Sequence, residues 1–306
     1  MQDGYWAIRR YKAGPIGETY KFWVPGKKPA RMTASAKAGI RKQAQNAQNA
    51  VKTLARLLNE NFRAGDYLLG LDYDEESYLK LEKASQPSPS GLRPATSPRG
   101  RGKEEAESVD GLWYAGRDEL ARGLRRVQYH AGKDGTDIKY AAVTSDLDPE
   151  TGEVVRVHHH LVVNREAKEY FEKHWKKGGV SWTMLSAQPD YTSIAVYLLA
   201  QVRHVEDAKK YTTSRKNLVR PQPEDRIAKS AAMIRAPKGA VLLDAGKNIP
   251  GQAQYIRYIL PDQAQTAEQH VKNGAVIVRA VDLHRRKETA PATVCGWGQK
   301  GGEHEI

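Results

Sequence analysis

The spacing of apolar residues changes several times along the chain, and each change predicts a different element. Residues 5–24 alternate, carry many aromatics and are interrupted by Gly14-Pro15, which predicts a two-stranded hairpin. Apolar residues then recur three and four positions apart over residues 41–62, as on an amphipathic helix. Residues 67–73, with the sequence YLLGLDY, are a short apolar run typical of a buried strand.

Two stretches in this first part lack periodicity. Residues 25–37 are basic and polar, which predicts a loop. Residues 86–107 are rich in Pro, Ser, Gly and charge and offer almost nothing to bury, a composition typical of a mobile linker. Its Arg and Lys side chains are able to contact DNA, although a solvated tether is the simpler explanation.

Beyond the linker, strand and helix patterns alternate. Helices are predicted at residues 111–129, 166–176 and 191–205, and strands at 138–144, 154–164, 180–185, 240–243 and 275–281. Residues 148–153, DPETGE, form the turn between the first two strands, and residues 252–260 fit either type. Helices alternating with antiparallel hairpins predict an α+β fold whose central antiparallel sheet is flanked by helices.

Charge narrows the choice of partner. The 306 residues include 49 Lys and Arg against 36 Asp and Glu, which gives a net charge of +13 and a pI near 9.6. Such an excess favours a polyanion, because phosphates attract it and release counterions on binding. Solubility or an anionic membrane surface is the alternative, but Arg and aromatic residues interleaved along the basic stretches favour nucleic acid.

Composition also excludes several classes. The single cysteine, Cys295, excludes an intrachain disulfide and a cysteine-based zinc site. No apolar run is long enough to span a bilayer, and the N-terminus lacks the apolar core of a signal peptide. We therefore expect a cytoplasmic protein without a membrane partner.

Three consecutive histidines carry the clearest chemical signal. Side chains alternate along a strand, so His158 and His160 share one face and His159 points to the other. Two imidazoles about 6–7 Å apart along one strand face are able to converge on one divalent cation. A bulge would exchange the partners, and histidines that merely pack are the alternative.

A tyrosine and a glutamine on a downstream helix form the second signal. Tyr197 and Gln201 are four residues apart and therefore lie on one helix face. A tyrosine hydroxyl is a weak nucleophile until its surroundings activate it, and a metal that polarises a phosphate supplies such surroundings. The amide oxygen of Gln201 is a suitable additional ligand. The alternative is an amphipathic core helix in which Tyr197 only packs.

Together these residues resemble the HUH endonucleases, whose strand bears two histidines around a hydrophobic residue and whose downstream helix bears a tyrosine. Residues 67–74, YLLGLDYD, are similar to the first motif strand of replication initiators, and residues 139–163 are similar to their central hairpin. The resemblance covers roughly residues 5–221. It is strongest for the rolling-circle replication initiators of bacterial phages, plasmids and integrated elements.

The resemblance implies an HUH-type sheet and nicking of single-stranded DNA through a 5′-phosphotyrosine. It implies Tyr197 as the nucleophile and His158, His160 and Gln201 as ligands of Mg²⁺ or Mn²⁺. Further candidates for extra or ligand-orienting groups are Asp72, Asp146 and His159. The implied partners are single-stranded DNA or a DNA hairpin at an origin, with a host helicase and polymerase in a bacterial cytoplasm.

Two positions depart from the family pattern. His159 stands where the middle residue of the triplet is usually hydrophobic, and Ala200 stands where many initiators have a lysine. The metal site depends on neither position. The role of that lysine in positioning DNA is open, with Arg203 and Lys209 as substitutes.

The basic segment after the tyrosine helix, residues 209–221, is the candidate DNA-binding surface. Lys and Arg neutralise phosphates, and a tyrosine can stack on an unpaired base. The candidate DNA-binding residues are Arg203, Lys209, Lys210, Tyr211, Arg215, Lys216 and Arg220. A solvated basic loop is the alternative, and residues 27–42 and 122–126 are further basic candidates.

The expected organisation is an endonuclease domain of residues 1–84 and 111–221, a linker of residues 85–110 and a C-terminal extension of residues 222–306. A relaxase or a single-tyrosine transposase would use the same chemistry. A non-catalytic nucleic-acid-binding module, or a metal-dependent hydrolase unrelated to nucleic acid, is an alternative of another class. The sequence has no GxxxxGK[ST] motif, which argues against a large initiator with its own helicase.

Overall fold

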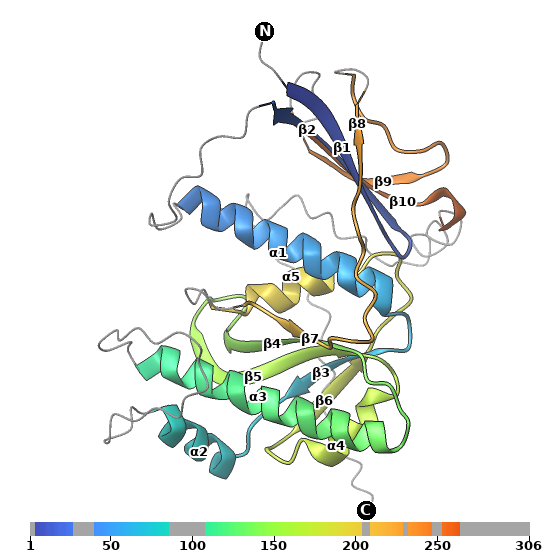
Figure 1. Ribbon diagram of the computed structural model, residues 1–306. Coiled ribbons are helices and arrows are strands. Elements are labelled where there is room, and N and C mark those ends of the chain that lie inside the picture. Colours follow the sequence, from blue (N-terminus) through green and yellow to red (C-terminus); the bar gives the residue numbers. More distant parts are fainter. Residues whose placement is uncertain are drawn as a thin grey trace, which may run out of the picture.

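The computed structural model describes residues 4–26, 40–85, 108–203, 209–228, 232–246 and 253–263. These residues form two five-stranded antiparallel sheets with helices between and behind them (Figure 1). The predicted α+β class is confirmed. The predicted linker at 86–107, the strand at 275–281 and nearly all of the loop at 25–37 lie outside the described residues.

One sheet, called the histidine sheet below, has the strand order β6-β3-β5-β4-β7. Its strands are β3 (Tyr67–Leu71), β4 (Tyr140–Leu147), β5 (Val154–Val163), β6 (Val180–Met184) and β7 (Thr212–Thr213). The predicted hairpin joins β4 to β5, and its turn is fixed by Asp148, whose carboxylate accepts hydrogen bonds from two backbone N–H groups. β4 is buried along nearly its whole length, as expected for a strand with helices on both faces.

The other sheet, called the hairpin sheet, has the order β8-β1-β2-β10-β9. Its strands are β1 (Gly4–Ala13), β2 (Ile16–Pro25), β8 (Glu224–Ile227), β9 (Val241–Gly246) and β10 (Gln254–Ile259). The predicted N-terminal hairpin is confirmed, with Gly14 at a φ of 53° in its turn. Residues 252–260, which fitted either type, form a strand.

The partners of the hairpin differ from the expected division of the chain. β1 pairs with β8, and β2 pairs with β10. Residues 1–84 and 222–306 were expected to belong to separate units, but their strands complete a single sheet. The described strands of the C-terminal extension, β8, β9 and β10, therefore belong to the same sheet as the N-terminal hairpin.

Helices separate the two sheets and cover the rear of the histidine sheet. They are α1 (Ile40–Asn61), α2 (Glu75–Ser85), α3 (Ser108–Lys133), α4 (Ala167–His174) and α5 (Thr192–Ala200). α1 and α5 lie between the sheets, while α2, α3 and α4 lie on the opposite side of the histidine sheet (Figure 1). The prediction missed α2 and continued α5 past Ala200, where the helix ends; residues 204–205 of the predicted helix lie outside the described residues. None of the helices described is long and apolar enough to cross a membrane.

Each face of the histidine sheet has its own hydrophobic core. The core toward α1 and α5 includes Leu54, Leu58, Val143, Val162 and Leu198. The core toward α3 and α4 includes Leu124, Val127, Leu161, Val163 and Phe171. Each fully buried aliphatic or aromatic side chain contributes about 1.5–3 kcal/mol, so the sheet is held firmly from both sides.

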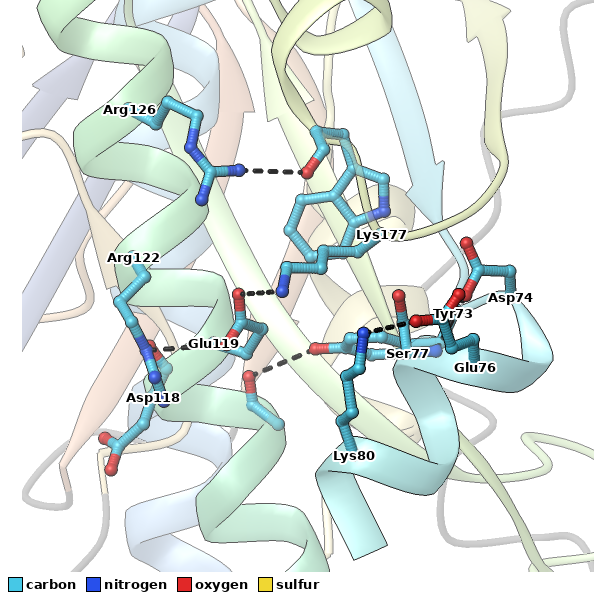
Figure 2. A network of polar contacts seen from close by, with 12 residues as sticks. Tyr73, Asp74, Glu76, Ser77, Lys80, Asp118, Glu119, Arg122, Arg126 and Lys177 are labelled. Atoms are coloured by element: carbon cyan, nitrogen blue, oxygen red, sulfur yellow. Dashed lines mark hydrogen bonds and ion pairs between the residues drawn. The ribbon is translucent and has the colours of Figure 1, made fainter. Parts of the chain in front are cut away.

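Polar contacts fasten the elements behind the histidine sheet to α3 (Figure 2). Glu119 of α3 pairs with Lys177 at 3.3 Å, and Arg126 donates to carbonyls at the end of α4. Tyr73, just after β3, donates to the Gly116 carbonyl at 3.4 Å. These contacts join side chains and carbonyls of different elements, so they fix the orientation of the rear helices relative to α3.

Candidate functional site

The predicted sharing of one strand face by His158 and His160 is confirmed. Both lie on β5 and face the α1–α5 side, opposite Ser145 and Val143 of β4. Their Nε2 atoms are 3.1 Å apart, and the two rings are nearly perpendicular with centroids 4.8 Å apart. This distance is that of a hydrogen bond between the two rings, and it brings both Nε2 atoms to one spot on the sheet.

The backbone orients the first of these rings. Nδ1 of His158 lies 2.8 Å from the carbonyl oxygen of Arg156. We assign the Nδ1–H tautomer from this contact, because a carbonyl can only accept. Nε2 of His158 then keeps its lone pair, and a carbonyl on the far nitrogen is the usual means by which proteins orient a metal-binding imidazole.

His160 is buried more deeply. Burial, together with the neighbouring His158 ring, lowers the pKa of His160 to about 4. The ring is therefore neutral at neutral pH. A neutral imidazole is the form that coordinates a cation, so the ring does not first have to lose a positive charge. In the hydrogen bond to His158, Nε2 of His160 is the donor, and this proton would move to Nδ1 when a cation binds.

Tyr197 and Gln201 of α5 lie beside this pair. The Tyr197 ring packs against the His160 ring, with ring centroids 5.5 Å apart. Partial burial raises the pKa of the Tyr197 hydroxyl. α5 ends at Ala200, and Gln201 is its C-cap, with Nε2 donating to the Tyr197 carbonyl at 3.1 Å. The Gln201 side chain is buried and hydrogen-bonds to both His160 and Tyr197.

His159 does not join this cluster. It faces α3, is fully buried, and is held by the Tyr73 hydroxyl at 2.7 Å and the Thr144 hydroxyl at 3.2 Å. Burial, with the charges of the neighbouring histidines, lowers its pKa to about 3. The structure therefore places His159 in the rear core and not among the ligands.

The two aspartates proposed as extra ligands lie in different settings. Asp146 is buried and pairs with Arg203 at 2.8 Å. Asp146 was expected to orient or complete the ligand set, and Arg203 was expected to bind DNA. In the structure the two side chains bind each other instead. Asp72 directly follows β3 and its side chain is exposed, while its carbonyl accepts a hydrogen bond from the Trp175 indole at 2.9 Å.

The candidate DNA-binding segment runs along the edge of the histidine sheet. β7 pairs with β4 there, a short strand that the prediction missed. Exposed cations flank it, namely Lys209, Arg215, Lys216 and Arg220, while Lys210 is half-buried. Tyr211 packs against the core beneath α1 and α5, and burial raises its pKa. Its aromatic face is thus engaged in packing rather than presented for stacking.

Sequence reasoning missed the residues that hold the start of α5. Asp190 accepts hydrogen bonds from the Thr192 backbone N–H at 3.0 Å, the Thr192 hydroxyl at 2.6 Å and Asn59 at 3.1 Å. Arg257 of β10 pairs with the other Asp190 oxygen at 3.2 Å and also donates to the Thr192 hydroxyl. An Asp just before a helix is a recognisable capping signal, but nothing local indicates Arg257.

Two imidazole nitrogens and one amide oxygen are donors that a divalent cation accepts, although nitrogen ligands suit a transition-metal ion better than Mg²⁺. The two Nε2 atoms, 3.1 Å apart, are close enough for both rings to hold one ion. Gln201 adds an oxygen donor beside them. The described residues contain no group of three or more His, Cys, Asp or Glu placed to hold a metal, so the site depends on the amide.

Comparison of the chain with protein-family models, with curated proteins and with solved structures finds no match.

Proposed function

We propose that this protein is a metal-dependent endonuclease of the HUH type that nicks single-stranded DNA through Tyr197. The observation that carries the proposal is the convergence of two Nε2 atoms, 3.1 Å apart, beside a tyrosine ring and a buried amide. A helix that served only for packing would not need a polar cluster at this point. Perturbed ionisable groups gathered in one place are characteristic of functional sites.

Each residue of the cluster has a defined role in this proposal. His158, His160 and Gln201 would hold Mg²⁺ or Mn²⁺ with two neutral nitrogens and one oxygen. When bound, the cation supplies charge neutralisation and Lewis-acid polarisation at the scissile phosphate. Gln201 also hydrogen-bonds to Tyr197, which lowers the pKa of the hydroxyl and partly offsets the rise caused by burial.

The covalent step exchanges one phosphate ester for another. The Tyr197 oxygen loses its proton and attacks phosphorus, while the bond from phosphorus to the 3′ oxygen breaks. The products are a 5′-phosphotyrosine and a 3′ oxygen that takes up a proton and becomes a free hydroxyl. Attack by a 3′-hydroxyl in the reverse sense rejoins a strand and releases Tyr197.

Exposed cations next to the site would guide the strand. Lys209, Arg215, Lys216 and Arg220 flank β7 at the sheet edge, where they can neutralise phosphates. The setting that we propose is initiation of rolling-circle replication in a bacterial cytoplasm, with an origin strand or hairpin as substrate and a host helicase and polymerase as partners. A relaxase or transposase would use the same residues.

The direct test is a covalent adduct. The protein is incubated with pooled single-stranded oligonucleotides and Mn²⁺ and run on a denaturing gel, alongside Tyr197→Phe and a sample with EDTA. We expect a shifted band that is absent from both controls. Tyr211→Phe is the matched control, because Tyr211 packs against the same core as Tyr197, and this variant should keep the band.

The other outcomes are informative. A band that survives in Tyr197→Phe would assign the nucleophile elsewhere. No band on any strand, together with tight and salt-sensitive DNA binding, would support a non-catalytic binding module. Binding that is weak and insensitive to salt would favour a hydrolase unrelated to nucleic acid.

A further inference from the structure

The hairpin sheet has one face turned to α1 and one turned away. Glu18 and Tyr20 of β2 face α1, where Arg56 hydrogen-bonds to both. Side chains alternate along a strand, so Thr19 and Lys21 lie on the far face. The far face is separated from the histidine site by the α1–α5 layer (Figure 1).

A basic depression of about 240 Å³ lies on this far face. Four of its lining residues are cations, Arg10, Lys21, Arg226 and Arg235, and no acidic residue lines it. The three arginines are exposed. Arg226 lies opposite Ile8 in the β1–β8 register, which makes Arg10 and Arg226 diagonal neighbours, about 7–8 Å apart. Two successive phosphates of an extended strand are separated by a comparable span.

A buried lysine forms part of the floor of the depression. Lys21 is only 2% exposed, donates to the Ala232 carbonyl and lies 5.4 Å from the Trp6 ring centre. Holding an ammonium in so buried a place costs free energy unless surrounding groups stabilise it. Here it also ties the segment after β8 to the sheet, so the wall that carries Arg235 is held in place.

Aromatic rings stand beside the cations. Trp6 and Trp23 are register partners on the far face and pack edge to face with centroids 5.5 Å apart. Trp23 remains 40% exposed, so part of its indole is accessible to a base. Arginine forks that bind phosphates next to rings on which bases stack are the combination that recognises single-stranded nucleic acid.

We propose that the far face of the hairpin sheet is a second binding surface for single-stranded nucleic acid, separate from the nicking site. Arg10, Arg226 and Arg235 bind backbone phosphates, and Trp23 stacks on a base. An acidic peptide would need the cations but not the exposed indole. Glu224, the register partner of Arg10, is the acidic residue on this face, and it lies outside the depression.

The test measures binding without cleavage, so that it does not depend on the proposed nicking activity. Tyr197→Phe protein in EDTA is titrated against fluorescein-labelled oligothymidylate at several salt concentrations. The triple variant Arg10→Gln, Arg226→Gln, Arg235→Gln should bind at least about ten-fold more weakly. The slope of log Kd against log salt should fall by about 2, the value for three lost contacts with single-strand phosphates.

The matched control removes the same charge elsewhere. Lys83→Gln, Lys133→Gln and Lys173→Gln change three exposed lysines on the helices behind the histidine sheet and should leave Kd within about two-fold. Equal weakening by both triples would overturn the proposal, because binding would then follow net charge alone. Thermal melts check that each variant is folded.

A second variant tests the aromatic part and guards against misfolding of the triple. Trp23→Leu should weaken oligothymidylate about ten-fold, as expected for one lost stacking contact, and should leave the affinity for a blunt duplex unchanged. An unchanged affinity for oligothymidylate, or an equal loss for duplex DNA, would contradict the assignment to single strands. If the wild-type protein forms no covalent adduct, the nicking proposal is refuted. The binding measurements in EDTA do not depend on that adduct and would still stand.

Discussion

The two sheets have the same number of strands and the same antiparallel pairing, but they present polar side chains in different ways. The central strands of the histidine sheet are covered by helices on both faces, and their fully buried ionisable groups are neutral or paired. His159 and His160 have lowered pKa values because of burial, and Asp146 pairs with Arg203. The hairpin sheet has charged residues on both faces, including the Glu18–Arg56 pair beneath it and the exposed arginines above it.

This difference matches the two functions that we propose, chemistry at the histidine sheet and strand binding at the hairpin sheet. Chemistry at a phosphate benefits from a dry site, where fixed donors act strongly. Binding a polyanion benefits from accessible cations whose counterions are released. The covered face of the hairpin sheet resembles the histidine sheet in shifting the pKa of a buried group. Nζ of Lys52 lies 3.8 Å from the centroid of the Tyr255 ring, and burial lowers the pKa of Lys52. Whether helices cover a sheet face therefore determines how its ionisable side chains behave, in both sheets.

The largest expected effect comes from removing a nitrogen at the histidine site. His160→Ala, and separately His158→Ala, should reduce the yield of the Mn²⁺-dependent adduct about 10²-fold or more, because a metal's charge stabilisation is worth several kcal/mol. The yield is measured by the denaturing-gel assay at saturating strand. Arg10→Gln on the other sheet is the control. An equal loss in that variant would erase the distinction between the two sheets.

The next effect concerns the link between the sheets. Arg257 of the hairpin sheet and Asp190 before the tyrosine helix are both buried and paired at 3.2 Å. Arg257→Met leaves a buried carboxylate without this cation and should lower the free energy of unfolding by about 3 kcal/mol. Chemical denaturation measures the change.

A coupled pair also predicts how two changes combine. The double variant Arg257→Met, Asp190→Asn should be less destabilised than the sum of the single variants. Simple additivity would show that the hairpin sheet does not support the start of α5 through this pair. The adduct yield of Arg257→Met would then remain at the wild-type level.

A smaller expected effect is the loss of unfolding free energy as the pH falls. The pKa of His159 is about 3 in the folded protein and about 6.5 in an unfolded chain, so the unfolded state takes up a proton first as pH falls. The contribution of neutral His159 to the free energy of unfolding is fully present above pH 6.5. It declines as the pH falls below that value, by about 2 kcal/mol at pH 5. Denaturation curves in EDTA at both pH values measure it. His160, with a pKa of about 4, adds a similar decline, so His159→Gln should remove about half of the dependence on pH. An unchanged slope would contradict the assignment.

Much of the histidine sheet was predictable because its signals are local. The alternation of side chains placed His158 and His160 on one face, and the i,i+4 spacing placed Gln201 one turn from Tyr197. Strong periodicity marked α1, α3 and the β4–β5 hairpin. α2 escaped because Leu81 is its only fully buried residue among those described, so it has no continuous apolar stripe.

The contacts that were not predicted depend on distant parts of the chain. Asp146 meets Arg203 because the β4–β5 register shifts between Ser145 and Leu147, and a bulge of this kind leaves no clear mark in the sequence. β8, with the sequence EDRI, has no apolar alternation and is exposed throughout. Periodicity identifies a strand but does not name its neighbour, so the pairing of β2 with β10 was not predictable.

The smallest expected effect tests whether exposure, and not charge alone, separates the two kinds of surface. Arg9 and Asp225 join β1 to β8 through two hydrogen bonds of 2.7 and 2.6 Å, but the side chains are 39% and 50% exposed. Arg9→Met should therefore cost less than about 1 kcal/mol of unfolding free energy, well below the loss for Arg257→Met, and most of it should vanish at high salt. Denaturation in low and high salt measures both. A loss as large as that of the buried pair would mean that β8 is held by this contact, and that the arginines of the far face owe their placement to it.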